Sequence, residues 1–332
     1  MTKIKIGIVG MGFIADWHYK SFKINPDAEI VGMTQDFYAD ENKINKMRAQ
    51  LKEKCTEWNI KAYDNFDEMV NDPGIDALII GSVNPYHYDQ IKKGFANNKF
   101  LLVEKPVVVD LDQIKELKEL VLKNNYKLFP GHNFVYRNAV IKAKELIDEG
   151  KLGQIMHGSI LVTHTISEYH QYGWRGKKEL SAGGTLMDSG HHVVYQSIYL
   201  LGVPSKLQAY TSKLRLKNMD CEDIAQVNLL YPDGSMGFLM QSWTSSFGND
   251  INGIRIFGDK GELIITDALY LNGEKIDSDT GYESTFINQA MAFTDYILHD
   301  KQPVSTLDDA ENSLKMILGA YESAEKGIVI NL

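Results

Sequence analysis

The sequence predicts an α/β protein with two domains: a doubly wound parallel sheet, then an α+β domain with an open, mostly antiparallel sheet. Two observations predict this class. Apolar strands alternate with one-faced helices up to about residue 130, and strands joined by turn residues dominate after residue 150. The chain has 332 residues, enough for two hydrophobic cores. We place the two domains at residues 1–128 and 129–332.

The N-terminal part alternates strands and helices, which implies βαβ units. The continuous apolar run within Asp76–Gly81 indicates a buried parallel strand, and the apolar residues spaced three or four apart in Leu111–Asn124 indicate a helix packed on one face. The predicted strands are Ile4–Val9, Glu29–Met33, Asp76–Gly81, Phe100–Val103 and Lys127–Phe129. The predicted helices are Asp40–Trp58, Asp67–Asn71, Tyr88–Asn97 and Leu111–Asn124.

After a helix at Ala139–Asp148 the pattern changes. Pro232-Asp233-Gly234 and the stretch Gly258–Gly261 are hairpin signals between pairs of strands. A helix over Leu186–Leu201 interrupts the strands and ends at Gly202. The predicted strands are Ile155–Thr165, Glu222–Tyr231, Ser235–Trp243, Ile254–Phe257 and Glu262–Ile265, and the last two predicted helices are Ser284–Leu298 and Asp308–Lys326.

Composition excludes several classes of function. The net charge of −9 argues against a nucleic-acid partner, which would favour a basic face. No apolar run reaches the roughly 20 residues that span a bilayer, and charged and glycine residues break the N-terminal apolar stretch, unlike a signal peptide. The only cysteines, Cys55 and Cys221, predict a reduced, cytoplasmic protein without disulfides. None of the nine histidines falls in a metal-binding spacing, so we predict no metal site.

Residues 3–15, KIKIGIVGMGFIA, carry a Gly-x-Gly-x-x-Ala turn between the first strand and a helix. Gly10 permits the tight turn, Gly12 leaves room for a pyrophosphate, and Ala15 lets the helix lie close on the strand. The alternative is a glycine-rich turn in an ordinary α/β protein. The order of strand, turn and helix favours the dinucleotide site of a Rossmann domain, with cofactor residues that include Gly10, Gly12, Phe13 and Ile14.

Two more loops follow strands of the predicted parallel sheet, and the carboxyl ends of such strands line the ligand crevice. In the first loop, Asn84 and His87 could reach the nicotinamide or its ribose, or form only a turn and a helix cap. Ser82, in the same loop, is also a predicted cofactor residue. In the second loop, Glu104-Lys105-Pro106, the lysine could donate a hydrogen bond that favours a developing alkoxide. The alternative for Lys105 is a solvated surface lysine.

Asp188 and His192 are four residues apart in the predicted 186–201 helix, so their side chains would share one face. An imidazole beside a carboxylate suits acid/base chemistry near neutral pH. Gly183-Gly184 just before would let another group approach closely. The alternative is a carboxylate that favours the helix dipole beside an incidental histidine.

Together these pieces resemble the Gfo/Idh/MocA family of NAD(P)-dependent oxidoreductases, which includes inositol and sugar dehydrogenases. Five motifs carry the resemblance in order: GIVGMGFIA at 7–15, SVNPYH at 82–87, EKP at 104–106, WRGKKELSAGGTLMDSGHH at 174–192 and AYESAEKG at 320–327. The resemblance implies a Rossmann domain followed by an open-sheet domain whose exposed face makes the contact of a homodimer or homotetramer. It implies a catalytic set of Lys105, Asp188 and His192, with Glu104 and Lys105 also beside the cofactor.

The implied reaction is hydride transfer between nicotinamide and a secondary hydroxyl of a small-molecule sugar, inositol or related polyol. His192 would take the hydroxyl proton, Asp188 would orient the imidazole or the substrate, and Lys105 would bond the reacting oxygen. The residues predicted to bind substrate are these three together with His170, Trp174 and Arg175. Two alternatives remain open: a non-catalytic NAD(P)-binding regulator, and an NAD-dependent glycosidase on the same scaffold.

The chain departs from the family pattern at two places. Many relatives end the second strand with an acidic residue that holds the adenosine ribose, and here Gln35 and Asp36 stand there. Asp36 on the ribose favours NAD because a carboxylate repels a 2′-phosphate, whereas Gln35 leaves NADP open. We therefore predict NAD, with NADP not excluded. Many relatives also carry an aspartate three residues after the histidine, where this chain has Tyr195, which bears on the substrate.

Overall fold

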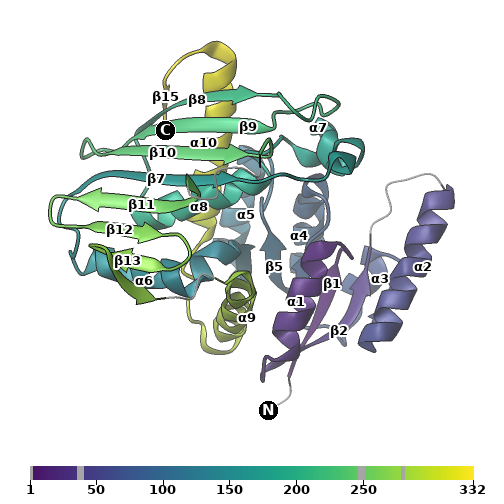
Figure 1. Ribbon diagram of the computed structural model, residues 1–332. Coiled ribbons are helices and arrows are strands. Elements are labelled where there is room, and N and C mark those ends of the chain that lie inside the picture. The colour runs from purple at the N-terminus through teal and green to yellow at the C-terminus, as the bar shows by residue number, and fades with distance from the viewer. Residues whose placement is uncertain (1–2, 36–40, 246–250, 278–280) are drawn as a thin grey trace. The chain divides into compact units, whose positions relative to one another are not determined.

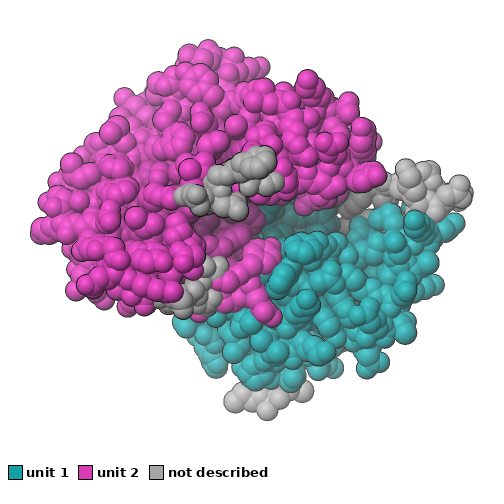
Figure 2. Space-filling model, viewed as in Figure 1, with its two compact units in different colours: residues 1–108, 112–131, 286–307 teal, residues 109–111, 132–285, 308–332 magenta. Residues whose placement is uncertain are grey.

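The structure is a computed structural model that describes residues 3–35, 41–245, 251–277 and 281–332. It divides into two compact units (Figure 2): unit 1 comprises residues 1–108, 112–131 and 286–307, and unit 2 comprises 109–111, 132–285 and 308–332. The functional division after residue 128 stays a prediction, and the compact units divide the chain differently because residues 286–307 return to unit 1.

Unit 1 is built on a six-stranded parallel sheet with the order β3-β2-β1-β4-β5-β6. Figure 1 labels β1, β2 and β5 of this sheet. The order reverses between β1 and β4, which is the switch point of a doubly wound sheet. The strands are β1 Ile4–Val9, β2 Ala28–Thr34, β3 Lys61–Ala62, β4 Ala77–Ile80, β5 Phe100–Glu104 and β6 Leu128–Gly131. The helices are α1 Phe13–Lys23, α2 Glu41–Trp58, α3 Phe66–Val70, α4 His87–Ala96 and α5 Leu111–Asn124, with a 3₁₀ turn η1 at Asn84–Tyr86.

The return of the chain to unit 1 has a clear packing reason. Helix α9, Tyr282–His299, carries Phe293, whose ring meets Phe22 edge-on at 6.3 Å and Phe129 at 5.6 Å. The Asn25 side-chain amide donates to the carbonyl of Ala290 at 3.3 Å. All three phenylalanines are buried. The predicted helix over Ser284–Leu298 is therefore present, but no local pattern indicates that it completes the core of unit 1.

Unit 2 is built on a nine-stranded sheet with the order β14-β13-β12-β11-β7-β10-β9-β8-β15. Only β10 and β7 pair in parallel; the other neighbours are antiparallel. The strands are β7 Ile155–Thr163, β8 Lys206–Ser212, β9 Ile224–Leu230, β10 Met236–Ser242, β11 Gly253–Gly258, β12 Glu262–Ile265, β13 Leu269–Leu271, β14 Glu274–Asp277 and β15 Ile330–Asn331. This confirms the predicted open, mostly antiparallel sheet.

The helices of unit 2 are α6 Asn138–Asp148, α7 Lys178–Ser181, α8 Ser189–Leu201 and α10 Leu307–Lys326, with 3₁₀ turns η2 Asn133–Tyr136, η3 Glu168–Tyr172 and η4 Trp174–Gly176. Strands β8, β13, β14 and β15 add to those predicted; the last three are only two to four residues long, too short to show a period. In the part of the chain that the structure describes, no helix is long and apolar enough to cross a membrane.

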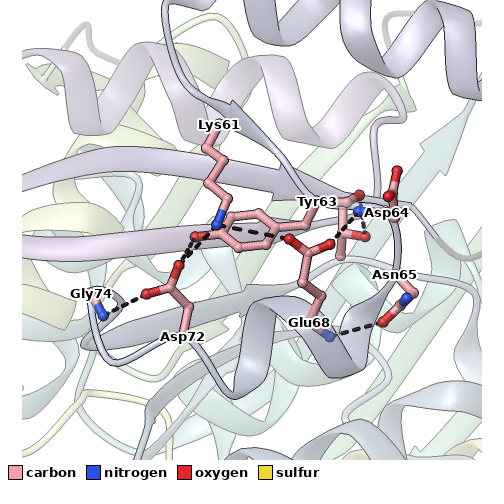
Figure 3. Close-up of polar contacts among 8 residues, drawn as sticks. Lys61, Tyr63, Asp64, Asn65, Glu68, Asp72 and Gly74 are labelled. Carbon is pink, nitrogen blue, oxygen red and sulfur yellow. Dashed lines mark hydrogen bonds and ion pairs between the residues drawn. The ribbon is translucent and has the colours of Figure 1, made fainter.

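A polar network fixes the segment around α3 (Figure 3). The Tyr63 hydroxyl donates to Asp72 Oδ2 at 2.6 Å, Lys61 Nζ donates to the same oxygen at 3.1 Å, and Gly74 N–H donates to Oδ1 at 2.7 Å. Donation from Tyr63, followed by the other donors, lowers the pKa of Asp72 to about 2. The network is therefore most stable with Asp72 charged.

Candidate active site

Gly10 and Gly12 have different roles in the turn between β1 and α1. Gly10 has φ +105°, and a Cβ there would lie 2.4 Å from the carbonyl oxygen of Gly81, so only glycine fits. Gly12 is the N-cap of α1 with φ −68°, and a Cβ there would meet nothing within 4 Å. Open space in front of Gly12, at the N-terminus of an 11-residue helix, fits the pyrophosphate of a dinucleotide.

Gln35, at the end of β2, holds the middle of this turn. Its Oε1 accepts the N–H of Met11 at 2.9 Å. On the other side Lys54 of α2 donates to the Met11 carbonyl at 3.2 Å and to Asp16 at 2.8 Å. Asp36, the alternative ribose residue, lies outside the described residues, so its role stays a prediction.

His87 lies between the loop that follows β4 and the loop that follows β5, and it contacts both. Its imidazole is fully buried, with Nδ1 2.8 Å from the Pro106 carbonyl and Nε2 3.0 Å from the Ser82 carbonyl. Burial lowers the pKa of His87. A neutral imidazole donates from one nitrogen only, so we assign the proton to Nδ1 and the shorter contact. The cofactor role of His87 stays a prediction; the geometry gives it the task of joining the loops.

The other predicted cofactor residues differ in exposure. Phe13 exposes 70% of its surface on the first turn of α1, whereas Ile14 is half-buried. Asn84 is buried at the start of η1. The Ser82 hydroxyl donates to Gln90 Oε1 at 2.6 Å. These contacts shape the loop, and direct contact with a cofactor stays a prediction.

Lys105 follows β5 directly, and Glu104 before it ties this loop to α1. Glu104 Oε1 lies 2.8 Å from Nε2 of His18, and its Oε2 accepts the backbone N–H of Lys105 at 3.3 Å. Both His18 and Glu104 are buried. The Lys105–Pro106 peptide bond is cis. The backbone of Lys105 is thus fixed, with its side chain half-buried at the carboxyl end of β5.

In unit 2, Asp188 ends a turn instead of lying inside a helix. The prediction of a helix from Leu186 was wrong at its start, because α8 begins at Ser189 and Asp188 is its N-cap. Glu222 causes the late start by accepting three successive backbone N–H groups. These are the N–H groups of Gly184, Thr185 and Leu186, at 3.1, 3.0 and 2.9 Å. The i, i+4 face argument therefore does not hold for Asp188.

The glycine pair before Asp188 makes room for Glu222 and its partner. A Cβ at Gly184 would lie 1.9 Å from the Glu222 carbonyl oxygen, and one at Gly183 would lie 2.3 Å from the Tyr321 hydroxyl. That hydroxyl donates to Glu222 Oε1 at 2.9 Å. The expectation that these glycines admit another group is confirmed. Burial raises the pKa of Glu222.

Charged and aromatic side chains gather around Asp188. Its Oδ2 accepts a hydrogen bond from Arg175 Nε at 2.6 Å, and the Arg175 guanidinium lies 4.3 Å from the ring centre of Trp174. Burial lowers the pKa of His164 and of His170, and the nearby charge of Asp188 opposes part of both shifts. The structure thus groups the predicted His170, Trp174, Arg175 and Asp188, and adds His164.

His192 lies in the first turn of α8 and is half-buried. Its Nδ1 is 2.6 Å from the hydroxyl of Tyr195, and its ring meets Phe134 edge-on at 4.7 Å. The neighbouring His191 is almost fully buried. Among the described residues, no group of three or more His, Cys, Asp or Glu could hold a metal ion.

Two sequence models of one family match this chain. The first, an oxidoreductase family with an NAD-binding Rossmann fold, matches residues 4–132, and the second, the Gfo/Idh/MocA C-terminal domain, matches 140–264. This chain belongs to the Gfo/Idh/MocA family. The match confirms the predicted family, the Rossmann domain and the NAD-type cofactor.

Several known proteins resemble the chain at low identity. An uncharacterised protein of Saccharomyces cerevisiae is 30% identical over 65% of this chain. This chain spans 60% of that relative's length, and 61% of an uncharacterised oxidoreductase of Schizosaccharomyces pombe. The NAD-dependent scyllo-inositol 2-dehydrogenase of Bacillus subtilis is 23% identical over 99% of this chain and 96% of its own. Levoglucosan dehydrogenase, solved with NADH and levoglucosan, shares the fold with a TM-score of 0.86 and 19% identity. The alignment covers 100% of this chain and 99% of that chain.

Within this Gfo/Idh/MocA fold, sequence reasoning missed the residues that support the site from a distance. Glu222 and Asn133 lie in no motif and gave no signal. Tyr321 lies in the AYESAEKG motif, which is its only signal in the sequence. His18 follows the glycine turn closely, yet only the fold shows that it meets Glu104.

Proposed function

We propose that this protein transfers a hydride between a nicotinamide cofactor and a secondary hydroxyl of a sugar, inositol or related polyol. The observation that carries the proposal is the place of Lys105. It follows β5, which is the neighbour of β4, and β4 pairs with the strand that leads into the glycine turn. An amine at this edge of an NAD-binding sheet suits an oxygen that gains negative charge during oxidation. Inositol dehydrogenases among the relatives support the polyol class.

Bound NAD would supply the hydride acceptor. Gly10 and Gly12 would hold its pyrophosphate. Lys105 would donate a hydrogen bond to the reacting oxygen, and His192 would take the hydroxyl proton on its Nε2. Asp188, held by Arg175, would accept hydrogen bonds from other hydroxyl groups of the substrate. NAD is favoured over NADP because Lys54, a cation beside the turn, is already paired with Asp16 at 2.8 Å.

The test is a panel of inositols and sugars assayed with NAD and with NADP. Lys105→Met and His192→Asn should each lower turnover by at least about tenfold, the loss of an interaction worth about 1.4 kcal/mol in the transition state. Unchanged turnover in both variants contradicts these roles. NAD binding without turnover of any compound would indicate a regulator. Cleavage of a chromogenic glycoside without net NADH would indicate a glycosidase.

We also propose a homodimer or homotetramer formed through the open face of the unit 2 sheet. Gln241 of β10 lies against Gly190 of α8, so the alternate residues of β10 point away from the helix. Met236 is one of these and is 60% exposed, and Tyr210, which shares its face across β9, is 62% exposed. Apolar surface of this kind is typical of subunit contacts. Light scattering of Met236→Lys should then show a smaller assembly than the wild type; an unchanged mass contradicts this face.

Both cysteines are buried free thiols. This state suits a reducing compartment, and we propose the cytoplasm.

A further inference from the structure

A chain of directed hydrogen bonds in unit 2 leads to His192. The Thr285 hydroxyl donates to the Tyr282 carbonyl at 2.7 Å, and its oxygen accepts from Asn133 Nδ2 at 3.0 Å. A threonine hydroxyl has one proton, and here that proton goes to Tyr282. Asn133 must therefore present its NH₂ group to Thr285, and its Oδ1 then faces Tyr195.

The Tyr195 hydroxyl lies at the centre of this chain, and Tyr195 is 1% exposed. The hydroxyl donates to Asn133 Oδ1 at 3.2 Å and accepts the backbone N–H of Phe134 at 3.0 Å. Its third neighbour is His192 Nδ1 at 2.6 Å. A hydroxyl offers one proton and two lone pairs. Since the proton goes to Asn133, the oxygen accepts from His192, and Nδ1 must carry a proton.

We propose that Tyr195, Asn133 and Thr285 are positioning residues that fix His192 in the tautomer with a proton on Nδ1 and a bare Nε2. This assignment rests on the proposed function, in which Nε2 is the base. The O–H bond of the substrate breaks, its electron pair forms the C=O bond, the proton bonds to Nε2, and the hydride leaves for the cofactor. The opposite tautomer presents an N–H at Nε2 and cannot accept that proton.

The residue type at position 195 also sets the charge beside the His192 imidazole. A phenol is neutral at physiological pH, so this neighbour adds no negative charge to stabilise an imidazolium. The other titratable or charged groups around the pair come from several elements. They are His191 on α8, His132 stacked on Tyr195 at 4.3 Å, Arg137 over the Phe134 ring, and Tyr282 against the same ring. A carboxylate at position 195 would favour the imidazolium and alter the pH range in which His192 acts as a base.

The direct test is NMR of the full-length protein labelled with ¹⁵N in its histidine rings, with His192 assigned by comparison with His192→Gln. A bare ring nitrogen and a protonated one have clearly different shifts. We expect a protonated Nδ1 and a bare Nε2 in the wild type, and a mixture or the opposite tautomer in Tyr195→Phe. Thr285→Val should give a smaller change in the same direction, and it keeps the test decisive if Tyr195→Phe does not fold.

Tyr231→Phe is the matched control. Tyr231 is also buried, and its hydroxyl has no hydrogen-bond partner among the described residues. Its removal should leave the His192 signals unchanged. An unprotonated Nδ1 in the wild type would overturn the assignment. So would His192 ring shifts that stay unchanged in both Tyr195→Phe and Thr285→Val.

Kinetics give a second readout. Tyr195→Phe should lower kcat by about tenfold to a hundredfold, part of the roughly 10²- to 10⁴-fold that a general base contributes, with the KM for NAD little changed. Tyr195→Asp should recover part of that loss and move the acidic limb of the pH–rate profile to higher pH. A purely structural role would instead lower the melting temperature and leave the pH profile in place. If no substrate is ever turned over, the proposed function fails, and the NMR still decides the tautomer.

Discussion

In unit 1 the residues of the candidate site follow buried strands directly, and backbone geometry makes the site: Gly10 turns the chain after β1, and Lys105 follows β5. In unit 2 the site depends on side chains from distant parts of the sequence. Asp188 ends a turn bound by Glu222, and Nδ1 of His192 lies 2.6 Å from the Tyr195 hydroxyl. The comparison shows that a local motif is enough to predict the geometry of a site that the backbone forms. It is not enough where a network of side chains from distant segments forms the site.

The largest effect should come from the glycine turn, where two matched variants separate folding from binding. Gly10→Ala should cost about 3 to 6 kcal/mol, because it combines a strained φ with overpacking against Gly81. Gly12→Ala should leave stability unchanged and weaken NAD binding at least about tenfold, because its Cβ enters open space where the pyrophosphate would lie. Urea unfolding and NAD titration measure the two quantities. Equal loss of stability in both variants would break the comparison.

The next effect concerns the network of unit 2. Glu222→Gln should cost about 2 to 3 kcal/mol, because an amide nitrogen cannot accept the backbone N–H group that a carboxyl oxygen of Glu222 accepts. It should also lower kcat and leave NAD affinity unchanged. Glu311→Gln is the control: Glu311 is similarly buried on α10 and pairs with Lys315 at 2.7 Å. That variant should lose stability without losing kcat. A fall in NAD affinity equal to the fall in kcat of Glu222→Gln would contradict the separation.

Glu222 should also give unit 2 a distinct dependence on pH. Burial raises its pKa in the folded protein above the ordinary value of 4.5. The folded state therefore holds the proton more tightly, and the contribution to stability is full below pH 4.5 and is lost as pH rises through the raised pKa. The difference in unfolding free energy between wild type and Glu222→Gln should therefore fall as pH rises, and urea unfolding at several pH values measures it. A difference that grows with pH would contradict the sign.

His87 should show the opposite slope in unit 1. Burial lowers its pKa below 6.5, so its contribution to stability is present above pH 6.5 and is lost as pH falls through the lowered pKa. His87→Gln should cost about 1 to 2 kcal/mol at pH 8, since it removes a buried hydrogen bond between two loops. The cost should shrink in acid. Urea unfolding between pH 5 and 8 measures this, and a constant cost would show that His87 does not titrate with unfolding.

The smallest effect should come from Asp72, whose polar network contains none of the candidate site residues. Its pKa is lowered to about 2, so its contribution is present above its ordinary value of 3.8 and is lost as pH falls through about 2. Asp72→Asn should reduce stability slightly at neutral pH, because an ion pair whose lysine side chain is 53% exposed contributes little. It should leave NAD binding and kcat unchanged. Acid unfolding followed by circular dichroism tests this, and a change in kcat would link the network to the site.

Much of the fold could be predicted, and the misses share a cause. Helix α5 has the predicted bounds, because its apolar residues recur at helical spacing over its whole length. The start of α8 was misplaced because the Gly184 and Leu186 amides bind Glu222, which lies in no local pattern. Helix α9 was found, but its place in unit 1 depends on Phe293 meeting Phe22 and Phe129.

The sequence by itself determined the Rossmann turn, the alternation of strands and helices, the family and the candidates Lys105, Asp188 and His192. These follow from residues close together in the chain, because glycine conformation and apolar periodicity are local properties. Only the tertiary structure decided that Gln35 holds the Met11 amide, that Glu222 builds the turn before Asp188, and that the Tyr195 hydroxyl lies 2.6 Å from Nδ1 of His192. Hydrogen bonds between side chains have direction and need exact placement in space, and that placement exists only after distant segments have packed together.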